Sequence, residues 1–212
     1  MKEISYRLQR CSRRTLVICV KGGEVIVKAP YGVPDVSVQN FVAAKREWIE
    51  KKLELQRDPE FEDIRAYNKV LDAGIQKAAV WGSKRNTEDI DTFYFVGLKA
   101  VRSYFEKTRC WILLETVHML AKTVGVCPEK VSVCDFKSRW GSCDITGHIK
   151  LNWRLCMLPP TLRDYVLIHE LCHRKHMDHS RAFWEEVGKF CPDYRIRRKR
   201  LKAYSFLTEL YR

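Results

Sequence analysis

One short stretch contains the residue types of a catalytic metal site: His169-Glu170-Leu171-Cys172-His173. Positions i and i+4 of a helix lie one turn apart on the same face, so His169 and His173 can bind one metal ion together. Glu170 then lies beside the ion, where it can accept a proton from a metal-activated water. Two imidazoles and a neighbouring glutamate in this spacing are typical of a zinc-dependent hydrolase that uses one Zn²⁺ ion.

The sequence around this motif predicts a central, buried helix over residues 162–176. Thr161 is expected to cap the helix, with Asp164 as its capping-box partner. Apolar side chains occupy nearly every face except the one that carries the motif, namely Val166, Leu167, Ile168, Leu171 and Cys172. Ionisable groups on such a helix are costly to bury unless they bind something. This cost favours a metal site over a pair of ordinary surface histidines.

His179 is the natural candidate for a third ligand, although it follows His173 by six positions. That spacing is too long for one continuous helical face, so the helix is expected to end near residue 176 or 177 and the chain to turn back. His176 is a rival ligand at i+3 from His173, but it falls off the line through His169 and His173. Three protein ligands leave a fourth zinc position for water, which marks a catalytic site. Asp178 is expected either to orient a ligand imidazole or to form a turn.

Composition and charge indicate where the protein is located and which kinds of partner it attracts. The 212 residues are 46% hydrophobic and 31% charged, and contain no apolar run long enough for a membrane span. The first residues lack a signal-peptide core, and the nine cysteines include no C-x-x-C pair, so we expect a cytoplasmic protein with free thiols and no membrane partner. The net charge of +13 implies attraction to polyanions. A basic run contributes to this charge and is either a solvated helix face or a phosphate-binding surface: Arg195, Arg197, Arg198, Lys199, Arg200 and Lys202.

Hydrophobic periodicity predicts the other elements. Strands are expected over residues 3–29 around a Lys21-Gly22-Gly23 turn, followed by a helix from about 35 to 56. A further helix is expected from Phe61 to near Gly74, then an exposed loop over 82–87 and a long helix over 98–123. Two strands, 131–136 and 148–152, precede the motif helix.

Several blocks of sequence closely resemble the YgjP-like metallopeptidases, which belong with the SprT-like and WLM-type zinc peptidases in the zincin group. The C-terminal blocks are Lys137-Ser138-Arg139-Trp140-Gly141-Ser142-Cys143, Gly147-His148-Ile149-Lys150-Leu151-Asn152, the segment Asp164 to His173, and His179-Ser180-x-x-Phe183-Trp184. The N-terminal blocks are Ser12-Arg13-Arg14-Thr15-Leu16, Val27-Lys28-Ala29-Pro30 and Lys45-Arg46-Glu47-Trp48-Ile49. The resemblance covers residues 1–56 and 98–205, and residues 57–97 depart from the family pattern.

The resemblance implies an α+β fold in which a small mixed or antiparallel sheet presents its edge strand to the H-E-x-x-H helix across a cleft. His169, His173 and His179 match the family's metal ligands, and Glu170 matches its catalytic base. We expect three parts: N-terminal strands and a helix that pack on the core (1–56), a divergent connecting segment (57–97) and a zincin-like catalytic domain (98–212).

Residues near that strand are candidates for binding the substrate: Arg139, Trp140, Gly141 and Ser142. An exposed strand edge can bind an extended peptide through main-chain hydrogen bonds, and Gly141 would permit close approach. The alternative is that Trp140 is a core anchor beside a bulge. Candidates for the donor that stabilises the oxyanion are Arg139, His148, Tyr194 and Arg198.

The leading hypothesis is a metallopeptidase that cleaves an amide bond of a peptide or protein, with a zinc-activated water and Glu170 as general base. A second hypothesis keeps the same centre for hydrolysis of a nucleotide phosphoanhydride, because the basic charge suits phosphates. A third is a nucleic-acid-associated factor.

Overall fold

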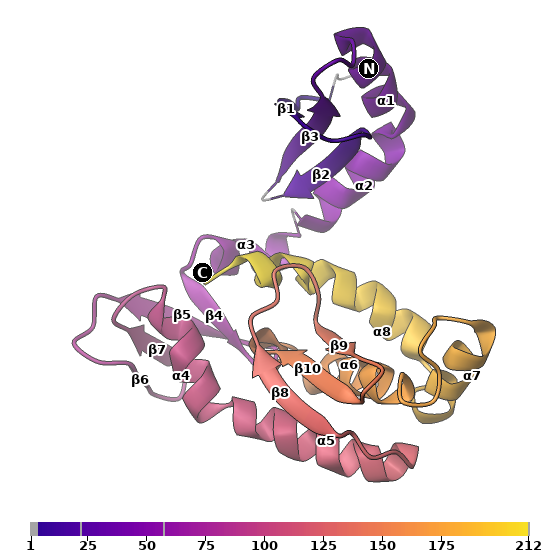
Figure 1. Cartoon of the computed structure of the whole chain (residues 1–212). Helices are drawn as coiled ribbons and strands as arrows, with labels where there is room; N and C mark the ends of the chain where they lie inside the picture. Colours follow the sequence, from indigo (N-terminus) through magenta and orange to yellow (C-terminus); the bar gives the residue numbers. More distant parts are fainter. Residues whose placement is uncertain (1–3, 22, 57, 212) are drawn as a thin grey trace. The chain divides into compact units, whose positions relative to one another are not determined.

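The computed structural model describes residues 4–21, 23–56 and 58–211, and the fold is α+β, as the sequence predicted (Figure 1). The chain divides into two compact units, residues 1–62 and residues 63–212. Within the described residues, no helix is both long enough and apolar enough to cross a bilayer.

The first unit contains a three-stranded sheet in the order β1-β3-β2. Strands β2 (Val17–Lys21) and β3 (Glu24–Pro30) form the expected antiparallel hairpin, and Gly22 of its turn lies outside the described residues. Strand β1 (Arg7–Cys11) pairs with β3 in parallel. The 3₁₀ turn η1 (Pro59–Phe61), which Asp58 caps through the N–H of Glu60, ends this unit.

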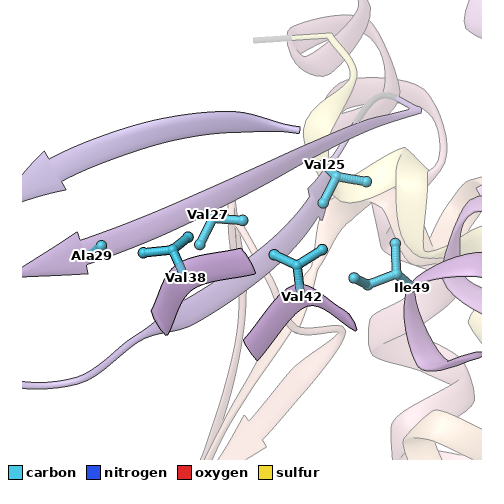
Figure 2. Packing of buried hydrophobic residues seen from close by; sticks show 6 residues of the cluster. All are labelled: Val25, Val27, Ala29, Val38, Val42 and Ile49. Atoms are coloured by element: carbon cyan, nitrogen blue, oxygen red, sulfur yellow. The ribbon is translucent and has the colours of Figure 1, made fainter. Parts of the chain in front are cut away.

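The core of the first unit joins β3 to two helices (Figure 2). Alternate residues of β3 point to one face of the sheet, and residues four apart on a helix share one side. The side chains that meet there are Val25, Val27, Ala29, Val38, Val42 and Ile49. This pattern is the one that the sequence predicted for strands followed by a helix.

The helix expected over residues 35–56 is two helices, α1 (Asp35–Ala44) and α2 (Arg46–Gln56). Lys45 separates them because its backbone leaves the helical region, with φ −107° and ψ 11°. The break occurs without glycine or proline, so no sequence signal marks it.

The short helix α3 (Glu62–Arg65) spans the boundary between the units, and the second unit continues with a four-stranded sheet in the order β4-β5-β7-β6. Its strands are β4 (Lys69–Asp72), β5 (Ile75–Trp81), β6 (Thr87–Glu88) and β7 (Thr92–Phe95). The helix predicted from Phe61 to near Gly74 is therefore wrong beyond Arg65.

The turn between β4 and β5 explains this difference. Ala73 and Gly74 both have positive φ, 50° and 88°, which gives the tight hairpin turn that antiparallel strands favour. Their N–H groups donate to the carbonyls of Cys156 and Met157, each at 2.9 Å. A partner more than 80 residues away thus fixes the turn, and local periodicity could not reveal it.

The long helix expected over residues 98–123 is also divided, into α4 (Ala100–Thr108) and α5 (Cys110–Val124). Arg109 lies at the break with φ −127°, and its guanidinium group reaches back to the preceding sheet. It donates to both carboxylate oxygens of Asp72 at 3.1 Å and to Glu88 at 2.6 and 2.7 Å. These ion pairs tie the helices to strands β4 and β6.

A second sheet, in the order β8-β10-β9, comprises β8 (Lys130–Cys134), β9 (Gly141–Cys143) and β10 (His148–Asn152). The 3₁₀ segment η2 (Trp153–Met157) leads into α6 (Pro160–Cys172), followed by α7 (Arg181–Phe190), α8 (Tyr194–Leu201) and η3 (Lys202–Glu209). Helix α6 is central to the unit because it contacts α5, α7, α8 and the edge strand β9 (Figure 1). The edge strand and the motif helix are therefore neighbours, as the family resemblance implied.

Candidate metal centre

Helix α6 carries the H-E-x-x-H motif and is shorter than the predicted helix. It begins at Pro160, whose fixed φ suits the first helical position, and Thr161 lies inside it. The predicted capping box is wrong, since the helix has no side-chain cap and Asp164 instead forms an ion pair with Arg163 at 2.9 Å. The helix ends at Cys172, so His173 is its C-cap residue.

The chain turns back immediately after the helix. The N–H groups of Lys175 and His176 both donate to the carbonyl of Cys172, which closes tight turns in place of another helical turn. Asp178 then accepts a hydrogen bond from the N–H of Ser180 at 3.2 Å, which makes it a turn residue. Ser180 caps α7 through the N–H of Phe183. These turns return His179 to the side of α6.

Three imidazoles converge at this point. One ring nitrogen from each of His169, His173 and His179 lies within 4.8 Å of the others. The Nε2 atoms of His169 and His179 are 3.1 Å apart. Two nitrogens bound to one tetrahedral zinc ion are about 3.3 Å apart, so His169 and His179 have the spacing of two zinc ligands, with a nitrogen of His173 nearby as the third.

A backbone hydrogen bond selects the free nitrogen of His173. Its Nδ1 atom lies 3.0 Å from the carbonyl of His176, which accepts the ring N–H. Nε2 is therefore left unprotonated and able to coordinate, an arrangement common among metal-binding histidines. The side chain of His176 is not part of the cluster, so the rival ligand contributes its carbonyl instead.

Phe183 lies beneath all three imidazoles. Its ring centroid is 4.9 Å from His169, 4.5 Å from His173 and 4.9 Å from His179. The side chain is fully buried. Because a close-packed ring has little room to move, Phe183 fixes the orientation of the three imidazoles.

Glu170 is buried beside this cluster, with 6% of its surface exposed. Among the described residues no donor forms a hydrogen bond or an ion pair with its carboxylate. Burial raises the pKa of Glu170 to about 8, against the opposing positive charge of Arg139. A buried carboxylate that lacks a protein partner is suited to exchange protons with a reacting group.

Burial favours the neutral form of two of the imidazoles, those of His169 and His173. Burial, then the charges of His173, His179 and Arg198, lower the pKa of His169 to about 3. Burial also lowers the pKa of His173, against the hydrogen bond to the His176 carbonyl. Neutral imidazole is the form that binds a metal ion.

The predicted substrate-binding residues lie along and before strand β9. Gly141 and Ser142 are in the strand, and Trp140 precedes it with a half-buried side chain. Gly141 faces Glu170 so closely that an added Cβ would lie 2.7 Å from Oε1. Arg139 is exposed, and its guanidinium group lies 4.7 Å from the ring centroid of Phe136.

Two features of the site were not predicted. One is the position of Phe183 beside all three imidazoles, since the sequence marked this residue only as part of a family motif. The other is an aromatic and cationic group on the outer side, where Trp184 lies 5.7 Å from both His169 and His179. Tyr194 and Arg198 contact Trp184 in turn, and their i, i+4 spacing is the signal that could have paired them.

Comparison with known proteins places the chain in a family. The YgjP-like family, metallopeptidase domain, matches residues 14–92 and 96–204. No match was found among curated proteins. The crystal structure of the metallopeptidase zymogen of Pyrococcus abyssi abylysin is 25% identical, with 42% of this chain and 90% of that chain aligned at a TM-score of 0.39. As its motifs predicted, the chain belongs to the YgjP-like family, carries the metallopeptidase domain and is a metal-dependent hydrolase.

Proposed function

We propose that the protein is a zinc-dependent peptidase in which His169, His173 and His179 hold one zinc ion and Glu170 is the general base. The observation that carries the proposal is the convergence of the three imidazole nitrogens within 4.8 Å, next to a buried carboxylate. A bound zinc ion supplies the Lewis acidity that lowers the pKa of a water and polarises a carbonyl.

A side chain of the protein then transfers the proton. Glu170 accepts it from the attacking water and delivers it to the leaving amine. The hydrogen bond from His173 to the His176 carbonyl and the contact with Phe183 keep the ligand rings in place while this happens. Gly141 leaves Glu170 the space in which its carboxylate lies.

Strand β9 is the proposed binding site for an extended peptide, within the segment Arg139 to Ser142. The carbonyl of Trp140 accepts from Asn152 at 2.8 Å, and the N–H of Asp144 donates to His148 at 3.1 Å. Along an antiparallel ladder, residue pairs that are hydrogen-bonded alternate with pairs that are not. Ser142 lies two residues from both Trp140 and Asp144, so its backbone groups also point to β10. The backbone groups of Gly141 and Cys143 therefore point to the open edge, where a substrate strand can pair with them.

The test combines metal analysis with substrate assays. Purified protein is expected to contain one zinc per chain by emission spectroscopy and to cleave unfolded casein or a peptide mixture, as followed by mass spectrometry. Glu170→Gln should keep the metal and lose cleavage, whereas His173→Ala should lose both. If the protein instead hydrolyses nucleoside triphosphates, loses that activity with Glu170→Gln and leaves peptides intact, the peptidase proposal is wrong.

A further inference from the structure

Two side chains of α8 lie on the ring of Trp184. Tyr194 stacks on Trp184 with ring centroids 5.2 Å apart and an interplanar angle of 14°. The guanidinium carbon of Arg198 lies 4.7 Å from the Trp184 centroid. Residues four apart share one face of a helix, so this face of α8 presents an aromatic ring and a cation together.

Trp184 connects this pair to the metal centre. Its ring is 5.7 Å from His169 and 5.7 Å from His179, so Arg198 is separated from the ligands by a single ring. Arg198 is thus beside the reacting centre without being part of it.

Arg198 differs from Arg197, the preceding residue, in its ion pairs and hydrogen bonds. Arg197 pairs with Asp193 at 2.9 Å and donates to the carbonyl of Thr161 at 3.0 Å. Arg198 is exposed, and within the described parts of the chain it forms no ion pair and no hydrogen bond. A guanidinium group that lies on an aromatic face keeps its N–H edge free, and that edge matches the two oxygens of a carboxylate.

We infer that Arg198, positioned by Trp184 and Tyr194, determines specificity by binding a carboxylate of the peptide substrate close to the scissile bond. The inference rests on the peptidase function proposed above. Aspartate and glutamate side chains and the terminal carboxylate are the anionic groups of an unmodified peptide. Trp184 separates Arg198 from His169 and His179, so the bound carboxylate is expected on a residue near the scissile bond and not at the bond itself.

The experiment uses one alanine–leucine host peptide with both ends blocked, in which a single glutamate is moved along the chain. Each peptide is matched by the version with glutamine at the same position. Binding to the zinc-loaded Glu170→Gln protein is measured by calorimetry, and kcat/KM is measured with the active protein. At one position glutamate should be preferred over glutamine by roughly tenfold or more, the size expected of a charge-assisted hydrogen-bonded pair.

Arg198→Met should remove this preference, since methionine keeps an apolar chain for Trp184 and loses the charge. Lys199→Met is the matched control, because Lys199 is the next residue and is also exposed, and its variant should retain the preference. Thermal melting and metal content identify any variant that has not folded. Arg198→Lys, which keeps the charge and loses the bidentate edge, should retain only part of the preference.

A second set of peptides separates the two sources of a carboxylate. Glutamine peptides of different lengths are compared with free and amidated C-termini. A preference confined to free termini assigns Arg198 to the chain end, whereas a preference for internal glutamate assigns it to an acidic side chain. Either outcome supports carboxylate binding by Arg198 if Arg198→Met abolishes the preference.

Three results would overturn the inference: no preference for a carboxylate at any position, a preference unchanged in Arg198→Met, or an equal loss in both methionine variants. The last would mean a general effect of surface charge. These results differ from failure of the peptidase proposal, in which no peptide is cleaved although the binding preference and its dependence on Arg198 persist.

Discussion

The α-carbon of Gly141 in β9 lies against the side chain of Glu170 in α6. A Cβ atom placed on Gly141 would be 2.7 Å from Oε1, 2.8 Å from Cγ and 2.9 Å from Cδ of Glu170. No real side chain tolerates such distances, so either the strand or the glutamate would have to move. The position of the edge strand and that of Glu170, the proposed general base, therefore depend on the absence of a side chain at residue 141.

Gly141→Ala is expected to lower kcat by roughly a hundredfold, because a displacement of about 1 Å in a catalytic group has an effect of that order. Metal content should be unchanged, since the three atoms nearest to a Cβ at residue 141 all belong to Glu170. Gly97→Ala is the control, because nothing lies within 4 Å of a Cβ at that position. Equal activity in the two variants would mean that Glu170 adapts freely.

His179→Ala is expected to lose the bound metal, and His176→Ala is expected to retain it. The side chain of His179 belongs to the imidazole cluster, whereas His176 contributes only its backbone carbonyl to His173. Emission spectroscopy of the purified variants and competition with a chromogenic chelator measure the difference. Retention of zinc at full affinity by His179→Ala would remove it from the ligand set.

Phe183→Leu is expected to weaken zinc binding roughly tenfold, as is typical when a residue that orients ligands is changed. The fold should survive, because a single core substitution costs about 0.5–3 kcal/mol, which is less than a typical total stability of about 5–15 kcal/mol. Phe105→Leu is the matched control, since Phe105 is equally buried but packs on Phe93 and Trp153. If both variants bind zinc equally well, Phe183 has no role in orienting the ligands.

Asp135→Asn is expected to make stability less sensitive to acid. Burial favours the neutral form of Asp135, but the hydrogen bond and charge of the fully buried Arg154, with the charge of Arg102, outweigh it and lower its pKa. The unfolded chain then binds the extra proton, so stability is present at neutral pH and is lost as pH falls below about 4.

Urea unfolding at pH 7 and pH 3.5 measures this effect. The wild-type protein should lose more stability than Asp135→Asn between the two values. At pH 7 the variant should be less stable by about 3 kcal/mol, because it loses the ion pair between Asp135 and the buried Arg154. Parallel loss of stability in both proteins would mean that the ion pair contributes nothing.

The sequence by itself determined the chemistry and the family. His169, Glu170 and His173 are brought together by helical geometry, which needs no information from the rest of the chain. Strands β2, β3 and β10 were likewise predictable, because alternation and turn residues are local signals. These predictions rest on interactions between residues close in sequence.

Only the tertiary structure determined the features that depend on contacts between residues far apart in the sequence. Strand β4 replaced a predicted helix because the Ala73–Gly74 turn bonds to the carbonyls of Cys156 and Met157. The contacts of Gly141 with Glu170 and of Arg198 with Trp184 likewise join elements whose approach is set by packing. Periodicity reports which face of an element is apolar, but it does not report which element covers that face.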